Sequence, residues 1–238
     1  MKFSKSNKVL TLVIIIIIAA VLMVPTAISL HKGNGNEDTT EDSLSAKKEY
    51  RVIDYPTPNY DRERGNEVVG VVLHHTAEPT VEKSLAILSS PERKVGTHVV
   101  IDTDGTRYVM AEPCVAAYHA GFSILNGREG CNYCTIGIEF QGNTLEAPLT
   151  SDQIASGIEY LLPIIAQYKI PLENIVTHEM VRNAYKQKYP NKRCSVKVDI
   201  TQEEYQRFMQ ALKFAWETSS SVLANINRHS CGGPEACF

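Results

Sequence analysis

Runs of apolar residues separated by turn sequences predict several β-strands. Residues 68–73, Val-Val-Gly-Val-Val-Leu, form a continuous apolar run rich in β-branched side chains, which is typical of a strand covered on both faces. Residues 97–102 and 106–110 flank the turn Asp-Thr-Asp-Gly, where Gly105 supplies a positive φ, and they predict a β-hairpin. Two further strands are predicted at residues 135–140 and 175–177.

Capping boxes mark the starts of two predicted helices. Thr150-x-x-Gln153 opens a helix that we expect to reach residue 169, with a kink at Pro163. Thr201-x-x-Glu204 opens a final helix to about residue 218, and a short amphipathic helix is predicted at residues 81–89. Strands mixed with helices of these lengths predict an α/β fold, in which a central mixed β-sheet is flanked by helices in a single domain.

The N-terminus carries a long apolar segment behind a basic flank. Lys2, Lys5 and Lys8 precede or begin a stretch that contains no charged residue from position 9 to position 30. A helix of this length can span a bilayer, with the basic flank in the cytoplasm. The alternative is a cleaved signal peptide with a small-x-small site at Ala27-Ile28-Ser29. Both interpretations predict an N-terminal hydrophobic helix and export of the remaining chain to the periplasmic or extracellular side of the cell envelope.

Changes in composition divide the chain into four predicted parts. Residues 1–30 form the signal peptide or membrane anchor, and residues 31–50 are polar and predict a flexible linker. Residues 51–219 form the folded domain, and residues 220–238 a C-terminal tail. A domain of this size buries enough apolar surface to fold without a metal, so a metal here would be functional rather than structural.

Composition and charge narrow the class of protein. The 238 residues are 43% hydrophobic and 21% charged with a formal net charge of −3, as in an ordinary globular protein, which we expect to be a monomer. The near-neutral charge argues against a general nucleic-acid binder. In an exported chain the default state of cysteines is the disulfide. We expect Cys231 to pair with Cys237, and one bond to form among Cys114, Cys131 and Cys134.

Histidines at strand ends are candidate metal ligands. His74 follows the buried strand at its carboxyl end, where α/β sheets place ligands, and His75 points the opposite way by strand alternation. A His-His pair at a strand end is, taken alone, more often structural than metal-binding. His178 follows the strand 175–177 and begins a predicted loop, and Cys194 comes later in the same basic stretch. Two histidines and a cysteine suit zinc and leave one tetrahedral position for water.

Two further residues have the chemistry of catalytic groups. Glu139 faces away from its apolar neighbours Ile138 and Phe140 on the predicted strand. Such a residue usually meets solvent or a lysine, but beside a metal site it would act as a general base. Lys192 stands two residues before Cys194 and is a candidate for polarising a substrate carbonyl, although most lysines of this basic stretch are expected to be solvated.

Five motifs follow one another along residues 52–214. They are Leu73-His74-His75-Thr76-Ala77; Gly96-Thr97-His98 with Asp102-x-Asp104-Gly105-Thr106; Ala117-Tyr118-His119-Ala120-Gly121; Ile136-Gly137-Ile138-Glu139-Phe140-x-Gly142; and Thr177-His178-Glu179. This series resembles the zinc N-acetylmuramoyl-L-alanine amidases of the peptidoglycan-recognition-protein superfamily.

The resemblance implies a cofactor, a substrate and a set of site residues. It makes His74, His178 and Cys194 the ligands of a Zn²⁺ ion, with Asp199 as the alternative third ligand. It makes Glu139 the catalytic base and places Thr97, His98 and His119 along the substrate groove. Thr97 stands where related phage enzymes carry a catalytic tyrosine, so that role is absent here or falls to Glu139. The implied substrate is peptidoglycan or its muropeptides, cut between N-acetylmuramic acid and L-alanine, with Lys192 and zinc stabilising the oxyanion.

Two alternatives remain open at this stage. A non-catalytic peptidoglycan-binding module can use the same fold, although such relatives typically lack the third ligand. A cysteine hydrolase would use Cys194 as its nucleophile, although that residue does not open a helix as such nucleophiles usually do.

Overall fold

The computed structural model describes residues 48–192, 194 and 199–230. Contacts divide the chain into one unit of residues 50–214 and a second of residues 1–49 with 215–238. Of the second unit, the description covers residues 48–49 and the continuation of the last helix. The predicted N-terminal hydrophobic helix, Cys231 and Cys237 lie outside the described residues. Among the described helices, none is long and apolar enough to cross a bilayer.

A six-stranded mixed sheet forms the centre of the larger unit, in the order β1-β5-β4-β9-β3-β10. Only β4 and β5 pair antiparallel within it; the other neighbours are parallel. β2 with β6 and β7 with β8 form two small antiparallel pairs. The strands are Val52–Asp54 (β1), Tyr60–Gly65 (β2), Gly70–His75 (β3), Val99–Ile101 (β4), Arg107–Val109 (β5), Val115–Ala117 (β6), Ile124–Leu125 (β7), Arg128–Glu129 (β8), Thr135–Phe140 (β9) and Ile175–Thr177 (β10).

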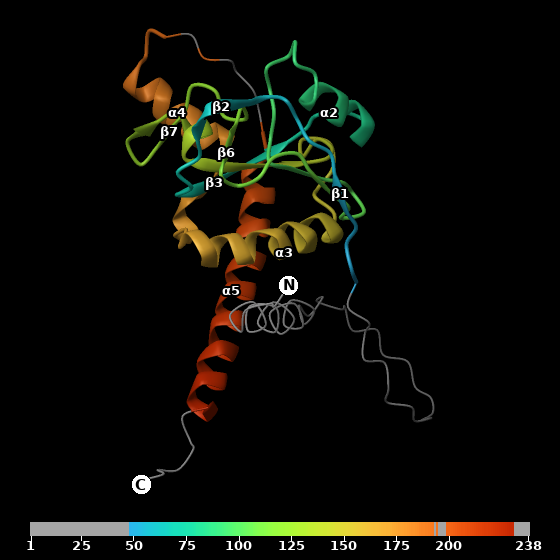
Figure 1. Ribbon diagram of the computed structural model, residues 1–238, viewed down its shortest axis with the longest axis vertical. Coiled ribbons are helices and arrows are strands. Elements are labelled where there is room, and N and C mark those ends of the chain that lie inside the picture. The colour runs from blue at the N-terminus through green and yellow to red at the C-terminus, as the bar shows by residue number, and fades with distance from the viewer. Residues whose placement is uncertain (1–47, 193, 195–198, 231–238) are drawn as a thin grey trace. The chain divides into compact units, whose positions relative to one another are not determined.

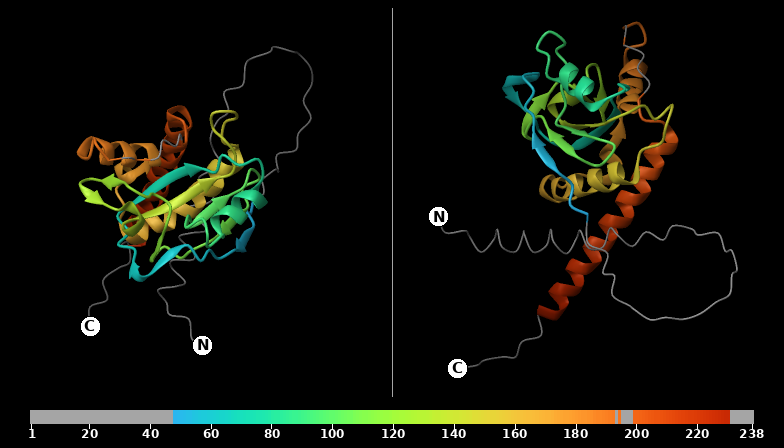
Figure 2. Two further views of the ribbon diagram at one scale, coloured as in Figure 1. Left: turned by 90° about the horizontal axis from the view of Figure 1, so that it is seen from above. Right: turned by 90° about the vertical axis from the view of Figure 1, so that its right-hand side faces the viewer.

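Helices cover both faces of the sheet. The described helices are Val81–Leu88 (α2), Ser151–Tyr168 (α3), His178–Lys188 (α4) and Gln202–Ser230 (α5), with short 3₁₀ turns at Cys131–Tyr133 (η1) and Leu172–Asn174 (η2). Figures 1 and 2 show α3 on one face and α2 with α4 on the other. The first turns of α5 pack on the α3 side, where Phe208 contacts Phe140 of β9 edge to face, with ring centroids 5.5 Å apart. The predicted architecture of a mixed sheet between helices is therefore confirmed for the described part.

Strand alternation places different kinds of side chain on the two faces of the central sheet. On β9, Ile136, Ile138 and Phe140 are fully buried and alternate with Thr135, Gly137 and Glu139. Phe140 marks the first set as the side that meets α3 and α5. The second set therefore faces α2 and α4, and this is the side on which the polar cluster described below is found.

Most predicted elements occur where the sequence patterns place them. β9 and β10 match the predicted ranges, the hairpin β4–β5 turns through Gly105 with a φ of +85°, and Thr150 with Gln153 forms the capping box of α3. α3 is continuous through Pro163.

Two predicted boundaries in the C-terminal part were wrong. The segment after His178 is the helix α4 rather than a loop, and α5 continues to Ser230 rather than ending near residue 218. Thr177 caps α4 by accepting from the backbone N–H of Met180 at 3.3 Å. Glu179 in its first turn and Lys186 and Lys188 in its last turn complement the helix dipole.

Candidate metal centre and pocket

The pairing of β3 with β9 places a histidine beside a glutamate. His74 is the register partner of Glu139 on the neighbouring parallel strand, and both side chains are buried. Side chains at paired positions of adjacent strands point to the same face of a sheet. The two predicted residues therefore lie together on the face that α2 and α4 cover.

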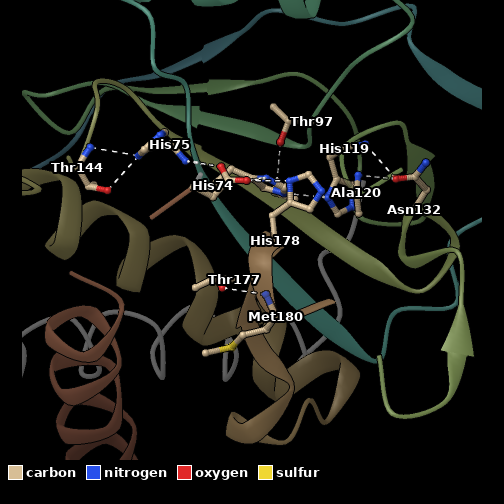
Figure 3. Close-up of polar contacts among 12 residues, drawn as sticks. His74, His75, Thr97, His119, Ala120, Asn132, Thr144, Thr177, His178 and Met180 are labelled. Atoms are coloured by element: carbon tan, nitrogen blue, oxygen red, sulfur yellow. Dashed lines mark hydrogen bonds and ion pairs between the residues drawn. The ribbon is translucent and has the colours of Figure 1, made fainter. Parts of the chain in front are cut away.

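The junction of β10 with α4 brings His178 to the same place. β10 runs parallel to β3 with Thr177 opposite Leu73, so the next residue of each strand end is a histidine. The rings of His74 and His178 lie 4.9 Å apart between centroids. In Figure 3 the rings of His74, His119 and His178 converge, whereas His75 points away toward Thr144, as alternation predicts.

Asp199 supplies a carboxylate between the two imidazoles. Its Oδ2 lies 2.8 Å from Nδ1 of His178 and 3.7 Å from Nδ1 of His74, and its side chain is fully buried. The backbone N–H of His75 donates to its Oδ1 at 3.3 Å. Burial works to raise the pKa of this carboxyl, but the contacts with His178 and His74 outweigh it and hold the pKa below its usual value.

These three side chains fit a metal ion. One ligand atom from each of His74, His178 and Asp199 lies within 4.8 Å of the others. Nδ1 of His178 and Oδ2 of Asp199 are buried and close, yet neither makes a hydrogen bond of acceptable geometry within the described residues. Atoms that approach closely without hydrogen bonding are the arrangement expected of ligands that share a cation. Two imidazoles and a carboxylate are a donor set that zinc accepts.

The third member of this group differs from the predicted Cys194. Asp199 is anchored through its own carboxylate and by the start of α5, where Thr201 donates its backbone N–H to Thr144 Oγ1 at 3.0 Å. Cys194 lies further back along the α4–α5 connection and lines the wall of the adjoining pocket. The geometry thus favours Asp199, the alternative ligand, over Cys194.

A pocket of about 560 Å³ opens over the cluster. Glu139, His119, His178 and Cys194 line it, together with two cationic side chains, Lys94 and Arg182. The other lining residues come from the loop after β3, from α2 and the loop that follows it, from the loop after β6 and from η1: Thr76, Ala77, Glu78, Ser84, Ile87, Leu88, Val95, Gly96, Tyr118, Ala120, Gly121, Phe122 and Asn132.

His119 lies between the pocket and the metal cluster. Its Nδ1 is 3.2 Å from Nε2 of His74, and its Nε2 is 3.3 Å from Oγ1 and 3.4 Å from the carbonyl oxygen of Thr135. Burial, followed by the nearby His74, His98 and His178, holds the pKa of His119 well below its usual value. Its predicted place along the groove agrees with the pocket lining, and it also contacts a ligand.

Thr97 and His98 are not part of the pocket wall. Thr97 donates its hydroxyl to the carbonyl of Gly137 at 2.9 Å, and both side chains are fully buried. Nδ1 of His98 accepts from the N–H of Gly137, and its Nε2 lies 2.9 Å from the carbonyl oxygen of Val115. Burial lowers the pKa of His98 to about 4. Backbone partners occupy the polar atoms of both residues, and neither belongs to the lining of the described pocket, so their predicted substrate role stays a prediction.

Lys192 lies on aromatic rings outside this lining. Its Nζ is 4.3 Å from the ring centroid of Tyr189 and 5.9 Å from that of Tyr185, and the side chain is exposed. This cation–π contact is a different setting from the predicted position beside a substrate carbonyl.

Two pocket residues escaped the sequence analysis. Arg182 stands four residues after His178, which on a helix brings it to the same face, but the segment was predicted as a loop. Asn132 accepts from the backbone N–H groups of His119 and Ala120 at 3.0 and 2.7 Å, and no pattern in the sequence indicates this. Asp199 did not escape the sequence analysis, because the family resemblance already named this residue as the alternative third ligand.

The predicted disulfide in the domain is not formed. Cys114, Cys131, Cys134 and Cys194 are free thiols, and the side chains of Cys131 and Cys134 contact each other.

Comparisons with known proteins agree on one family. The family profile described as N-acetylmuramoyl-L-alanine amidase matches residues 64–197. The chain is 39% identical over 90 residues to 1,6-anhydro-N-acetylmuramyl-L-alanine amidase AmpD of Haemophilus influenzae, covering 37% of this chain and 47% of that protein. It is 31% identical over 124 residues to N-acetylmuramoyl-L-alanine amidase AmiD of Escherichia coli, covering 45% and 44%. The chain thus spans less than half the length of these relatives.

Solved structures support the fold. A crystal structure of a selenomethionine derivative of AmpD aligns with a TM-score of 0.50 and 21% identity, over 67% of this chain and 93% of that one. The solution structure of the PlyG catalytic domain aligns with a TM-score of 0.51 and 14% identity, over 70% and 95%.

Proposed function

Because this chain belongs to the N-acetylmuramoyl-L-alanine amidase family, we propose that it is a zinc-dependent hydrolase of the amide bond between N-acetylmuramic acid and L-alanine in peptidoglycan. The observation that carries the proposal is the group His74, His178 and Asp199 beside Glu139, next to a pocket that His178 and Glu139 line. A binding module would need the pocket but neither the three ligands nor the buried carboxylate beside them.

The proposed hydrolysis uses a bound metal cation and a general base. His74, His178 and Asp199 would hold a Zn²⁺ ion, which when bound polarises a carbonyl group and makes a water more acidic. Glu139 takes a proton from the attacking water, whose oxygen bonds to the lactyl carbonyl carbon. Glu139 then gives that proton to the alanine nitrogen as the carbon–nitrogen bond breaks.

Two cationic side chains of the pocket are available to bind carboxylates of a substrate. Lys94 and Arg182 belong to the lining together with the acidic Glu78 and Glu139, and the nine-tenths buried Arg182 also lies 3.6 Å from the carboxylate of Glu179. Stem peptides of peptidoglycan carry carboxylates, for which a guanidinium group is a strong partner. We propose that Arg182 and Lys94 bind the peptide part of a muropeptide.

The choice of the residue that stabilises the oxyanion depends on which residue is the third metal ligand. Lys192 was predicted from its place two residues before Cys194, and Lys197 has that same spacing to Asp199. We propose that Lys197 takes the role, although it lies outside the described residues. Lys197→Ala should lower kcat by at least ~10²-fold, the scale for loss of one oxyanion partner. Lys192→Ala is the matched control and should change kcat little, and the reverse ranking of the two variants would restore Lys192.

Activity and metal content of the full-length chain test the proposal. Wild-type protein should bind about one zinc per chain and release L-alanine-terminated peptide from muropeptides. His74→Ala should lose both properties, whereas His75→Gln, changed in the neighbouring residue that faces away, should keep the metal. Glu139→Gln should keep zinc and lose about 10²-fold or more in kcat, because the amide cannot accept a proton. Zinc binding without turnover in the wild type would leave a binding module.

Export remains part of the proposal. It rests on the basic flank and the apolar stretch of residues 9–30, which would place the domain outside the cytoplasmic membrane, anchored or released. A reporter enzyme joined after Tyr50 should be active only on the outer side, and activity confined to the cytoplasm would contradict export.

A further inference from the structure

A chain of buried hydrogen-bonding groups leads from η1 to the metal cluster. It runs from the carbonyl of Cys131 through Thr135 and His119 to His74. This inference rests on the proposed metal site and concerns what prepares it. We propose that Thr135 and His119 are positioning residues that hold His74 as the tautomer protonated at Nε2, so that its Nδ1 lone pair faces Asp199 and the metal.

Proton counting begins at the threonine hydroxyl. Oγ1 of Thr135 donates to the carbonyl oxygen of Cys131 at 2.7 Å, and a hydroxyl has a single proton to give. Toward any other neighbour this oxygen can only accept. Nε2 of His119 lies 3.3 Å from it and 3.4 Å from the carbonyl oxygen of the same residue. Both neighbours are acceptors, so Nε2 of His119 must carry a proton.

The position of the proton on His119 determines which nitrogen of His74 carries a proton. A neutral imidazole with a proton on Nε2 has only a lone pair on Nδ1. Nδ1 of His119 is 3.2 Å from Nε2 of His74, so the proton in that contact must belong to His74. Nδ1 of His74 is then unprotonated, and it is the atom that lies 3.7 Å from Oδ2 of Asp199. Without this arrangement, the ring of His74 could carry its proton on Nδ1 and donate it to Asp199. A protonated Nδ1 cannot bind a metal, so that tautomer would oppose metal binding.

The surroundings of His119 fix its ring in place. A Cβ at Gly137 would lie 2.5 Å from Cγ of His119, so only glycine at that position of β9 leaves room for the ring. Asn132 holds the backbone on either side by accepting from His119 and Ala120. Figure 3 shows the ring of His119 between Asn132 and His74. Partners that orient a histidine ligand in this way typically change metal affinity by about 10- to 100-fold.

The tautomer of His74 can be measured without any metal. Full-length, zinc-free protein labelled with ¹⁵N in histidine should give the NMR pattern of a His74 ring protonated at Nε2. His119→Leu removes the acceptor, so His74 should become a mixture of tautomers and zinc affinity should fall by about 10- to 100-fold. His119→Asn places an amide oxygen near the former Nδ1 and should restore most of both properties.

Threonine variants provide a milder, matched pair. Thr135→Val removes the hydroxyl but leaves the carbonyl acceptor, and it should shift the ¹⁵N signals of His119 and reduce zinc affinity less than His119→Leu. Thr97→Val removes an equally buried hydroxyl that bonds to the same strand and should leave the His74 tautomer and zinc affinity unchanged. Circular dichroism checks that each variant is folded.

The outcomes separate this inference from the proposed function. A His74 protonated at Nδ1 in the zinc-free wild type, or wild-type zinc affinity in His119→Leu, would overturn the positioning role. If the wild-type protein bound no zinc at all, the proposed function would fail, while the tautomer of His74 would still decide the inference.

Discussion

At the scale of single residues, the two histidines of the candidate metal site could be predicted because each follows the end of a strand. His74 and His178 each follow a buried apolar strand, and parallel strands end at the same edge of a sheet. That argument does not choose between Cys194 and Asp199 as the third ligand. Both residues stand in the irregular connection between α4 and α5, where the pattern of apolar and polar residues does not predict where a side chain lies. Motif order alone also does not show that the polar atoms of Thr97 and His98 bond to the backbone.

The assignment of Asp199 can be tested against Cys194 directly. Asp199→Ala should abolish zinc binding, because it removes the carboxylate between the two imidazoles. Cys194→Ser should keep about one zinc per chain, because its side chain lines the pocket wall. Metal analysis after dialysis against a weak chelator provides the measurement. Loss of zinc from the serine variant with retention in the alanine variant would restore the cysteine as ligand.

Buried histidine should make the domain sensitive to acid. Burial lowers the pKa of His98 to about 4, whereas the pKa of a histidine in the unfolded chain is near its ordinary value of 6.5. The unfolded chain therefore binds the proton first, so the stability this neutral ring provides is complete above pH 6.5 and is lost as the pH falls toward 4. The difference is of the order of 3 kcal/mol. Denaturant unfolding at pH 7 and at pH 4.5 measures it. His98→Asn, which cannot titrate, should be less stable at pH 7 but should show a flatter dependence on pH.

At the scale of elements, the sheet was more predictable than its helices. Apolar runs and one turn signal located β3, β4, β5, β9 and β10, which make up most of the central sheet. The edge strand β1 and the strand β2 carry mostly exposed or half-buried positions, and β6, β7 and β8 have only two or three residues each, so no long apolar run marks these strands. α4 was missed because its composition is polar and basic, and only its cap and charge distribution favour a helix.

The close approach of β9 to His119 predicts a sharp effect of a small change. Gly137→Ala would place a methyl group 2.5 Å from Cγ of His119, and either the strand or the ring must move. We expect a loss of about 1–3 kcal/mol in the free energy of unfolding. Gly65→Ala is the control, because its Cβ would meet only the carbonyl of Cys114 at 3.4 Å. Equal stability of the two variants in urea would contradict the tight fit.

At the scale of the whole molecule, the central sheet and the family match describe the same part of the chain. The chain matches the amidase profile over residues 64–197, and the sheet with its covering helices agrees with the predicted class. Residues 1–47 and 231–238 lie outside the described part, so the signal or anchor, most of the linker and the terminal cysteine pair stay predictions. The predictions for these segments rest on amino-acid composition. Composition indicates the cellular compartment but not the three-dimensional structure of the segment.

The position of Asp199 has a consequence for protease resistance. His74 belongs to β3, His178 begins α4, and Asp199 stands just before α5. A shared zinc ion would therefore join the start of α4 and the end of the α4–α5 connection to β3. Such a tie closes a loop and lowers the entropy gained when that segment opens locally. Lys192, Arg193 and Lys197 are trypsin sites within the closed loop. Brief digestion should therefore spare this connection in zinc-loaded protein and cut it within minutes after chelation, and in Asp199→Ala zinc should give no protection.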